Sequence, residues 1–231
     1  PLYITQFREE VSLERRNSHG EGDLRQWTGK AMVVTGVYYA LALLGGGLVV
    51  GYFTRMWAAA PFVILALFCL WFFRDPEREI PGDATVAVSP ADGKVVLIRK
   101  EADGRTRMAI FLNVFDVHVN RTPIAGRVKS VTYKPGKFLV ASVDEASLEN
   151  EQNVLVVEGE GTSIEFSQIA GLIARRIVCY KKPGDAVAKG ERIGLIKFGS
   201  RVDVLVGPEW EFTVKPGERV SAGSSVIAKR K

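Results

Sequence analysis

Histidine and cysteine are both scarce in this chain of 231 residues, which contains two of each. Cys69 lies inside an apolar run and Cys179 follows an Ile-Val pair, so neither a CxxC metal motif nor a framework of several disulfides can be drawn. A reducing compartment is compatible with this usage, and we expect no metal centre. Since His19 and His118 are the two histidines, a mechanism that needs a base near neutral pH has few candidates.

The composition excludes a disordered chain, because 47% of the residues are hydrophobic and 25% are charged. The 31 Lys and Arg outnumber the 26 Asp and Glu, which gives a net charge of +5. This balance suits contact with an anionic lipid or a nucleic acid, and plain solubility explains it equally well.

Two long stretches without a charged residue lie near the N-terminus, at 31–53 and 56–73, with Thr54 and Arg55 between them. At about 1.5 Å per residue, helices of these lengths span roughly 35 Å and roughly 27 Å, against a hydrocarbon core of about 30 Å. The sequence therefore predicts a hydrophobic helical hairpin in a membrane. The glycines at 45–47 and Pro61 weaken the helices, so a monotopic hairpin that lies in one leaflet stays open.

Basic residues near the hairpin predict its orientation. Five of them precede the hairpin, Arg74 and Arg78 follow it, and the turn holds Arg55 alone. The positive-inside rule then places both termini in the cytoplasm, on the inner side of the cell membrane. We divide the chain into a polar, amphipathic segment at 1–30, the hairpin at 31–73 and a domain at 74–231.

From about Thr85 onward, short β-branched runs alternate with Gly and Pro, which indicates a mainly β domain of antiparallel strands. One helix is expected near 144–150. The runs that we expect to form strands are 95–99, 108–114, 127–133, 153–159, 163–171, 176–180, 192–198 and 202–207.

Two pairs of segments in this domain repeat each other with an offset of 33 residues. PADGKV at 90–95 resembles PIAGRV at 123–128, and PGDAVAKGERIG at 183–194 resembles PGERVSAGSSVI at 216–227. The second pattern is typical of barrel-sandwich hybrid folds such as lipoyl and biotinyl carriers, in which glycine supplies the positive φ of tight turns. We predict a β sandwich built from two related halves.

Strand periodicity does not explain the polar residues of three segments. These are SPADGKV with Asp92, NVFDVHVNR with His118, and KFGSRVDV with Gly199 and Ser200. Each signal is weak by itself, because Asp-Gly and Gly-Ser are common in turns and a strand histidine is often structural. Together they supply a nucleophile, a base and a residue that orients the base.

The surroundings of these residues argue against two familiar classes. If the strand around His118 is regular, Asp116 and Asn120 share its face. A serine hydrolase would place its nucleophile in a GxSxG elbow, which Ser200 lacks. A carrier domain would present a lysine at the tip between the second pair of repeats, where this chain reads KFGSR.

Six segments, taken together, closely resemble the short prokaryotic phosphatidylserine decarboxylases, which are made as proenzymes. They occur in family order between about Phe72 and Ile227, and the apolar hairpin resembles theirs as well. The segments are FFRDPER at 72–78, SPADGKV at 89–95, VHVNRTPIAG at 117–126, the stretch 136–153, IAGLIARRIV at 169–178 and GLIKFGSRVD at 194–203.

The resemblance implies that the chain cuts itself between Gly199 and Ser200. Ser200 Oγ, deprotonated by a His118 that Asp92 orients, would attack the Gly199 carbonyl, and elimination would leave a pyruvoyl cofactor at the start of 200–231. The ketone of this group would form a Schiff base with the amine of phosphatidylserine, and loss of carbon dioxide would give phosphatidylethanolamine. Longer relatives carry a second histidine where this chain has Phe115, so His118 is also the expected proton donor.

A lipid substrate explains an anchored enzyme, because exposing acyl chains to water costs about 0.8 kcal/mol per CH₂. We expect phosphatidylserine and anionic membrane lipid as partners, no nucleic acid, and a homodimer by resemblance. Arg121, Lys137, Arg175 and Arg176 are basic residues suited to the phosphodiester, and none is assigned to it. The alternative is a membrane-tethered β adaptor without enzymatic activity, in which Ser200 is inert; a membrane serine hydrolase is a third, more distant reading.

Overall fold

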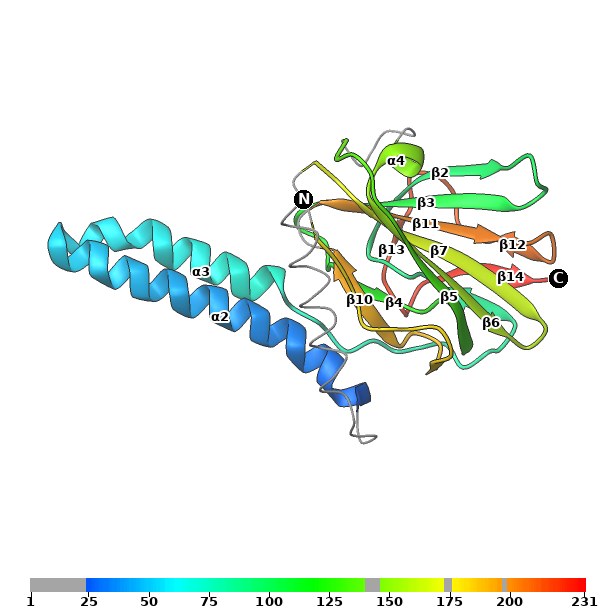
Figure 1. The fold of residues 1–231 in the computed structure, drawn as a ribbon, viewed down its shortest axis with the longest axis horizontal. Helices are drawn as coiled ribbons and strands as arrows, with labels where there is room; N and C mark the ends of the chain where they lie inside the picture. Colours follow the sequence, from blue (N-terminus) through cyan, green and yellow to red (C-terminus); the bar gives the residue numbers. More distant parts are fainter. Residues whose placement is uncertain (1–23, 140–145, 173–175, 197–198) are drawn as a thin grey trace.

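A helical hairpin projects from a β domain in the computed structural model of this chain (Figure 1). The structure describes residues 24–139, 146–172, 176–196 and 199–231, with side chains from residue 34 onward. The C-terminus lies at the end of the β domain that is remote from the hairpin (Figure 1). The prediction of a mainly β, antiparallel fold that follows an apolar helical segment is confirmed.

The hairpin consists of α2 (Leu24–Phe53), the short 3-10 helix η1 (Met56–Ala59) and α3 (Ala60–Phe72). Its turn lies at Thr54 and Arg55, as predicted. Helix α2 begins before the expected start at residue 31, and residues 1–23, with His19, lie outside the described residues. The segment Val34–Phe53 is long and apolar enough to cross a membrane, with a mean hydropathy of 1.7.

Close packing between the two helices depends on glycines of α2. A Cβ at Gly47 would lie 2.8 Å from Cβ of Phe62, and one at Gly36 would lie 2.8 Å from Cβ of Phe73. The expectation that the glycines at 45–47 and Pro61 weaken the helices stays a prediction, and none of these residues interrupts its helix. Helix α2 runs through the glycines, and Pro61 lies in the first turn of α3, where its missing N–H removes no helical hydrogen bond.

The β domain contains one large sheet and two small ones, and every strand pair is antiparallel. The large sheet has the order β13-β2-β3-β11-β7-β6-β5-β9, and the small sheets have the orders β1-β14-β12 and β4-β10-β8. Buried apolar side chains from all three sheets form one core. The bounds are β1 Val86–Val88, β2 Gly93–Lys100, β3 Thr106–Leu112, β4 Val119–Arg121, β5 Gly126–Lys134, β6 Gln152–Gly159, β7 Thr162–Ala170, β8 Ile177–Cys179, β9 Ala186–Val187, β10 Arg192–Ile196, β11 Ser200–Val206, β12 Trp210–Phe212, β13 Arg219–Val220 and β14 Val226–Arg230.

All eight runs that were expected to form strands overlap one, although residues 197–198 of the run 192–198 lie outside the described residues. The helix α4 (Ala146–Glu149) lies within the expected helix at 144–150. Residues 144–145 of that stretch are outside the described residues. The strands that the sequence did not predict are two to five residues long, which is too short for a periodic pattern to be recognised.

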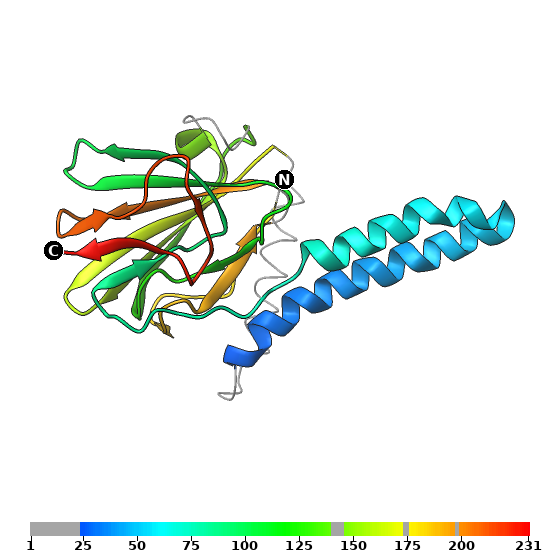
Figure 2. The ribbon, with the colours of Figure 1, turned by 180° about the vertical axis from the view of Figure 1, so that it is seen from behind.

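The two related halves are visible in the pairing of the strands. Gly93 pairs with Val220 between β2 and β13, and Gly126 pairs with Val187 between β5 and β9, which is the same contact shifted by the repeat offset. One half comprises β4 to β10, and the other comprises β1 to β3 together with β11 to β14. The first half is therefore inserted into the second, and the C-terminal strands, orange to red, lie among the green strands in the view from behind (Figure 2).

The two connections between these halves lead to the residues of the candidate site. The loop after β3 leads to His118, and the connection from β10 to β11, of which residues 197–198 lie outside the described residues, leads to Gly199. Ile196, the last residue of β10, donates its N–H to the His118 carbonyl at 3.3 Å. The candidate site therefore lies at the boundary between the two halves.

A strap at residues 74–80 ties the hairpin to this end of the domain. Phe72 and Phe73, at the end of α3, pack with Val117, Val119 and Leu195 in a second apolar cluster. Just beyond them, the buried carboxylate of Asp75 forms ion pairs with Arg121 of β4 at 3.0 Å and with Arg192 of β10. These contacts hold the end of the hairpin against β4 and β10 of the domain.

Candidate active site

Ser200 begins β11, the strand at the centre of the large sheet, where it pairs with Leu112 of β3 and Ala170 of β7. Its side chain is completely buried, and Oγ has no hydrogen-bond partner among the described residues. A buried hydroxyl without a partner is costly, so its presence calls for an explanation. Gly199 before it has φ of 65°, a conformation that favours glycine, and open space around the position of a Cβ.

His118 contacts the backbone of Gly199, the residue before Ser200. Its Nδ1 lies 2.9 Å from the Asp116 carbonyl and its Nε2 lies 3.2 Å from the Gly199 nitrogen. Because the carbonyl can only accept and the N–H can only donate, these partners assign the proton to Nδ1 and leave Nε2 with a lone pair that accepts from the Gly199 N–H. The imidazole also lies against the Phe72 ring, with a centroid distance of 4.4 Å.

Burial lowers the pKa of His118 to about 4, against the smaller opposing effect of its contact with Asp116. The nearby Arg74 lowers this pKa further. At neutral pH the side chain is therefore an uncharged base whose Nε2 lone pair accepts from the N–H of Gly199, the residue before Ser200.

The stretch before His118 is a turn, so the expected sharing of one strand face by Asp116, His118 and Asn120 is wrong. Strand β4 begins only at Val119. Side chains close the turn: Asn113 Oδ1 accepts from the Phe115 N–H at 2.7 Å, and Asp116 Oδ2 accepts from the Asn113 N–H at 2.9 Å. Asp116 thus orients His118 with its backbone carbonyl and not with its carboxylate.

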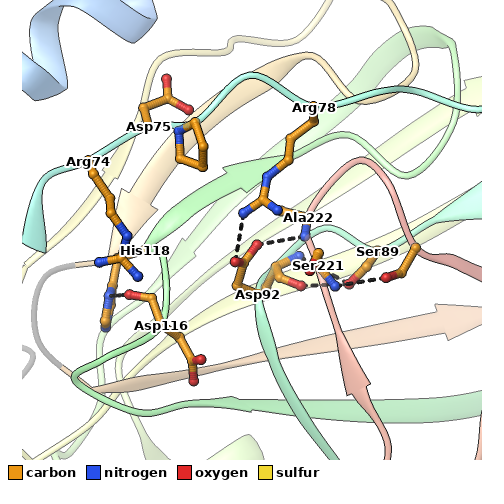
Figure 3. Close-up of polar contacts among 12 residues, drawn as sticks. Arg74, Asp75, Arg78, Ser89, Asp92, Asp116, His118, Ser221 and Ala222 are labelled. Carbon is orange, nitrogen blue, oxygen red and sulfur yellow. Dashed lines mark hydrogen bonds and ion pairs between the residues drawn. The ribbon is translucent and has the colours of Figure 1, made fainter.

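Asp92 lies in the same region, but the described contacts include none between it and His118. Its Oδ2 accepts from Arg78 at 2.8 Å and its Oδ1 accepts from the Ala222 N–H at 2.7 Å (Figure 3). Burial raises the pKa of Asp92, which the hydrogen bond from Ala222 and the charge of Arg78 oppose. The contact that orients His118 in this structure comes from Asp116.

Two of the four basic residues considered for the phosphodiester already form ion pairs with carboxylates. Arg121 is buried and held by Asp75, and Lys137 forms an exposed ion pair with Glu149 at 2.8 Å. Arg176 is exposed, and Arg175 lies outside the described residues. None of them is brought to His118 by a described contact.

Sequence reasoning missed two arginines that the structure places at the site, Arg74 and Arg78. Arg78 is the ion-pair partner of Asp92, and Arg74 extends toward His118 in Figure 3. Both stand in FFRDPER, which was used only as part of a resemblance and of a charge count. The signal that could have found them is their position, because basic residues directly after an apolar hairpin lie where anionic lipid headgroups would be.

The comparisons with known proteins point to one family. A family model described as phosphatidylserine decarboxylase matches residues 65–228, a range that includes Asp92, His118 and Ser200. The chain belongs to the phosphatidylserine decarboxylase family. The resemblance drawn from the six segments and the prediction of an enzyme are thereby confirmed.

Individual relatives carry the same name. The phosphatidylserine decarboxylase proenzyme of Solibacter usitatus is 64% identical over 199 residues, which cover 86% of this chain and 97% of that protein. The phosphatidylserine decarboxylase proenzyme of Erythrobacter litoralis is 47% identical over 222 residues, which cover 88% and 89% of the two chains. That of Magnetococcus marinus is 49% identical over 175 residues, covering 73% and 80%.

Proposed function

We propose that this chain converts phosphatidylserine to phosphatidylethanolamine with a pyruvoyl group that it makes from Ser200 by cutting the Gly199-Ser200 bond. The observation that carries the proposal is the unpartnered, buried Ser200 Oγ directly after Gly199, whose N–H donates to Nε2 of His118 at 3.2 Å. A hydroxyl held for attack on the adjacent carbonyl explains why no other group satisfies it.

In the self-cleavage, His118 Nε2 takes the proton of Ser200 Oγ while Oγ attacks the carbonyl carbon of Gly199. The hydrogen bond from the Gly199 N–H to Nε2 must give way for this, since one lone pair serves both. The C–N bond then breaks, the freed nitrogen of Ser200 takes a proton from His118, and an ester joins the two parts. Loss of the Ser200 α-proton expels the Gly199 carboxylate, and water replaces the nitrogen as ammonia to leave a ketone.

Asp92 has an indirect role in this proposal. Its carboxylate holds Arg78 of the strap and the Ala222 N–H of the loop between β13 and β14, so it fixes both walls of the site. We therefore expect an Asp92→Asn substitution to slow cleavage less than loss of the His118 base. Gly199 supplies an unhindered carbonyl in a backbone conformation that other residues rarely adopt.

The pyruvoyl group, once formed at position 200, supplies an electrophilic ketone for the substrate amine and accepts the electron pair released with carbon dioxide. Around that position, His118 is the group that can hold or deliver a proton, and the Phe72 ring excludes water from one side of it. The hairpin of α2 and α3 anchors the domain at the cytoplasmic face of the cell membrane, with its exposed apolar side chains in lipid. A homodimer belongs to the proposal by family resemblance and is checked by native mass spectrometry in detergent.

The proposal is tested by trapping the substrate on the enzyme. Purified protein is incubated with phosphatidylserine and cyanoborohydride, and the modified peptide is mapped. We expect the lipid adduct at the N-terminus of the 200–231 piece, and no cut chain and no adduct in Ser200→Ala. An adduct on a lysine, or activity in uncut Ser200→Ala, would refute the proposal and favour a different class of enzyme.

A further inference from the structure

Arg74 follows the hairpin by two residues, and neutral groups hold its guanidinium. Its Cζ lies 3.9 Å from the centroid of the Trp71 ring, and it donates to the carbonyls of Trp71 at 3.0 Å and Phe115 at 2.8 Å. Within the part of the chain that the structure describes, no acidic side chain forms an ion pair with it. A guanidinium has five N–H donors, so several stay available for a further ligand.

The other arginines around the site have already found anionic partners. Arg78 is paired with Asp92 at 2.8 Å, Arg121 with Asp75 at 3.0 Å, and Arg219 with Asp116. Arg74 is therefore the arginine of this group whose positive charge lacks a direct counterion among the described residues. It is also fixed in place by stacking and two hydrogen bonds, which lowers the entropy that it loses on binding a ligand.

The guanidinium lies between the hairpin and the catalytic groups. It extends toward His118 in Figure 3, and its charge interacts with Asp92 and Asp116. On its other side, Trp71 and the exposed Phe115 pack against each other with ring centroids 5.9 Å apart. Tryptophan at the end of an apolar segment prefers the headgroup layer of a membrane, so Arg74, stacked on Trp71, lies where a lipid headgroup would enter the site.

From this arrangement we propose that Arg74 binds the phosphodiester of phosphatidylserine and thereby places the serine amine of the headgroup over position 200. The inference rests on the proposed function and adds the residue that recognises the phosphate. An arginine matches two phosphate oxygens with parallel N–H donors, which fixes the direction of the headgroup as well as its depth.

The carboxylate of the substrate is a less suitable ligand for this arginine. Its charge leaves the carboxylate during decarboxylation, so a cation bound to it stabilises the substrate more than the transition state. The phosphodiester keeps its charge throughout the reaction, and binding it does not oppose the loss of carbon dioxide.

The test compares two substrates in neutral detergent micelles, phosphatidylserine and O-octyl-L-serine, which has the amine and carboxylate without a phosphodiester. Each rate is divided by the pyruvoyl content of the preparation, so incomplete processing does not affect the result. We expect Arg74→Gln to lower kcat/KM for phosphatidylserine about 10- to 100-fold, mainly through KM, the size of a lost hydrogen bond to a charged group. For O-octyl-L-serine we expect little change.

Arg99→Gln is the matched control, because it removes the same charge from an exposed side chain on β2 and should leave both substrates unaffected. Arg74→Lys keeps the charge without the planar donors and should give an intermediate loss for phosphatidylserine alone, which covers the case of a poorly folded Arg74→Gln. Equal losses for the two substrates, or no loss for either, would overturn the inference while the proposed function stands. A wild-type chain without decarboxylase activity would overturn both.

Discussion

The pH dependence of self-cleavage depends on a single side chain in this account, the buried His118. Burial lowers its pKa from 6.5 to about 4, and at 1.36 kcal/mol per pKa unit this shift favours the neutral form by about 3 kcal/mol. Only the neutral form offers the Nε2 lone pair. We therefore expect the cleavage rate to stay constant from pH 7 down to about pH 5 and to fall to half near pH 4, where the folded-state histidine takes up its proton.

Folding stability should change in the same direction. The unfolded chain binds the proton near pH 6.5 and the folded chain only near pH 4, so acid favours the unfolded state between these values by up to about 3 kcal/mol. Stability from this group is therefore complete above the unfolded pKa and is lost as the pH falls.

The rate can be measured on freshly synthesised precursor in detergent by a pH jump, with the cut fraction read from denaturing gels. His118→Gln is the matched variant, since its amide oxygen can accept from the Gly199 N–H but cannot act as a base. It should cleave about 100- to 10,000-fold more slowly at every pH. A wild-type midpoint between pH 6 and 7, or normal cleavage of His118→Gln, would refute the reasoning.

Three further predictions follow from the packing. Asp75→Asn leaves Arg121 and Arg192 without their shared buried counterion and should lower the free energy of unfolding by about 3 to 5 kcal/mol in thermal denaturation. Glu77→Gln, at an exposed partner of Arg192, should change the free energy of unfolding little, and equal effects of the two substitutions would contradict the role of Asp75 in holding the strap. Gly47→Ala forces a Cβ against Phe62 and should weaken the packing of the hairpin by about 1 to 3 kcal/mol, which limited proteolysis in detergent would detect as faster cutting. Gly45→Ala, with nothing within 4 Å of its Cβ, should be cut no faster than the unchanged chain, and equal protection of the two variants would argue against this packing. After cleavage the pieces should stay together on native size exclusion and part only in denaturant, because β11 pairs with β3 and β7 along its length; separation in buffer would speak against the central position of β11.

Much of the fold was predictable because the signals were local and repeated. The charge-free stretches at 31–53 and 56–73 predicted the hairpin, and the 33-residue offset predicted two related halves. The sequence could not show that one half is inserted into the other, since that depends on which strands pair across the sheet. Pairing partners such as Ser200 and Ala170 are determined by long-range packing of the core.

The sequence predicted which residues form the site better than it predicted the contacts between them. Ser200 and His118 were chosen for their chemical types, and in the structure His118 accepts from the N–H of Gly199, the residue before Ser200. The choice of Asp92 as the group that orients His118 followed from residue type alone, and the contact is made by the Asp116 carbonyl. A backbone carbonyl carries no sequence signal, and the turn that presents it depends on Asn113 as well.

The central claim, that the chain makes its own ketone from Ser200, is tested most directly by the intact mass of the denatured, purified protein. The account predicts two polypeptides, residues 1–199 and 200–231, of which the second is lighter by one ammonia than a peptide that begins with serine. An active preparation that contains only the uncut chain of 25.4 kDa would contradict it.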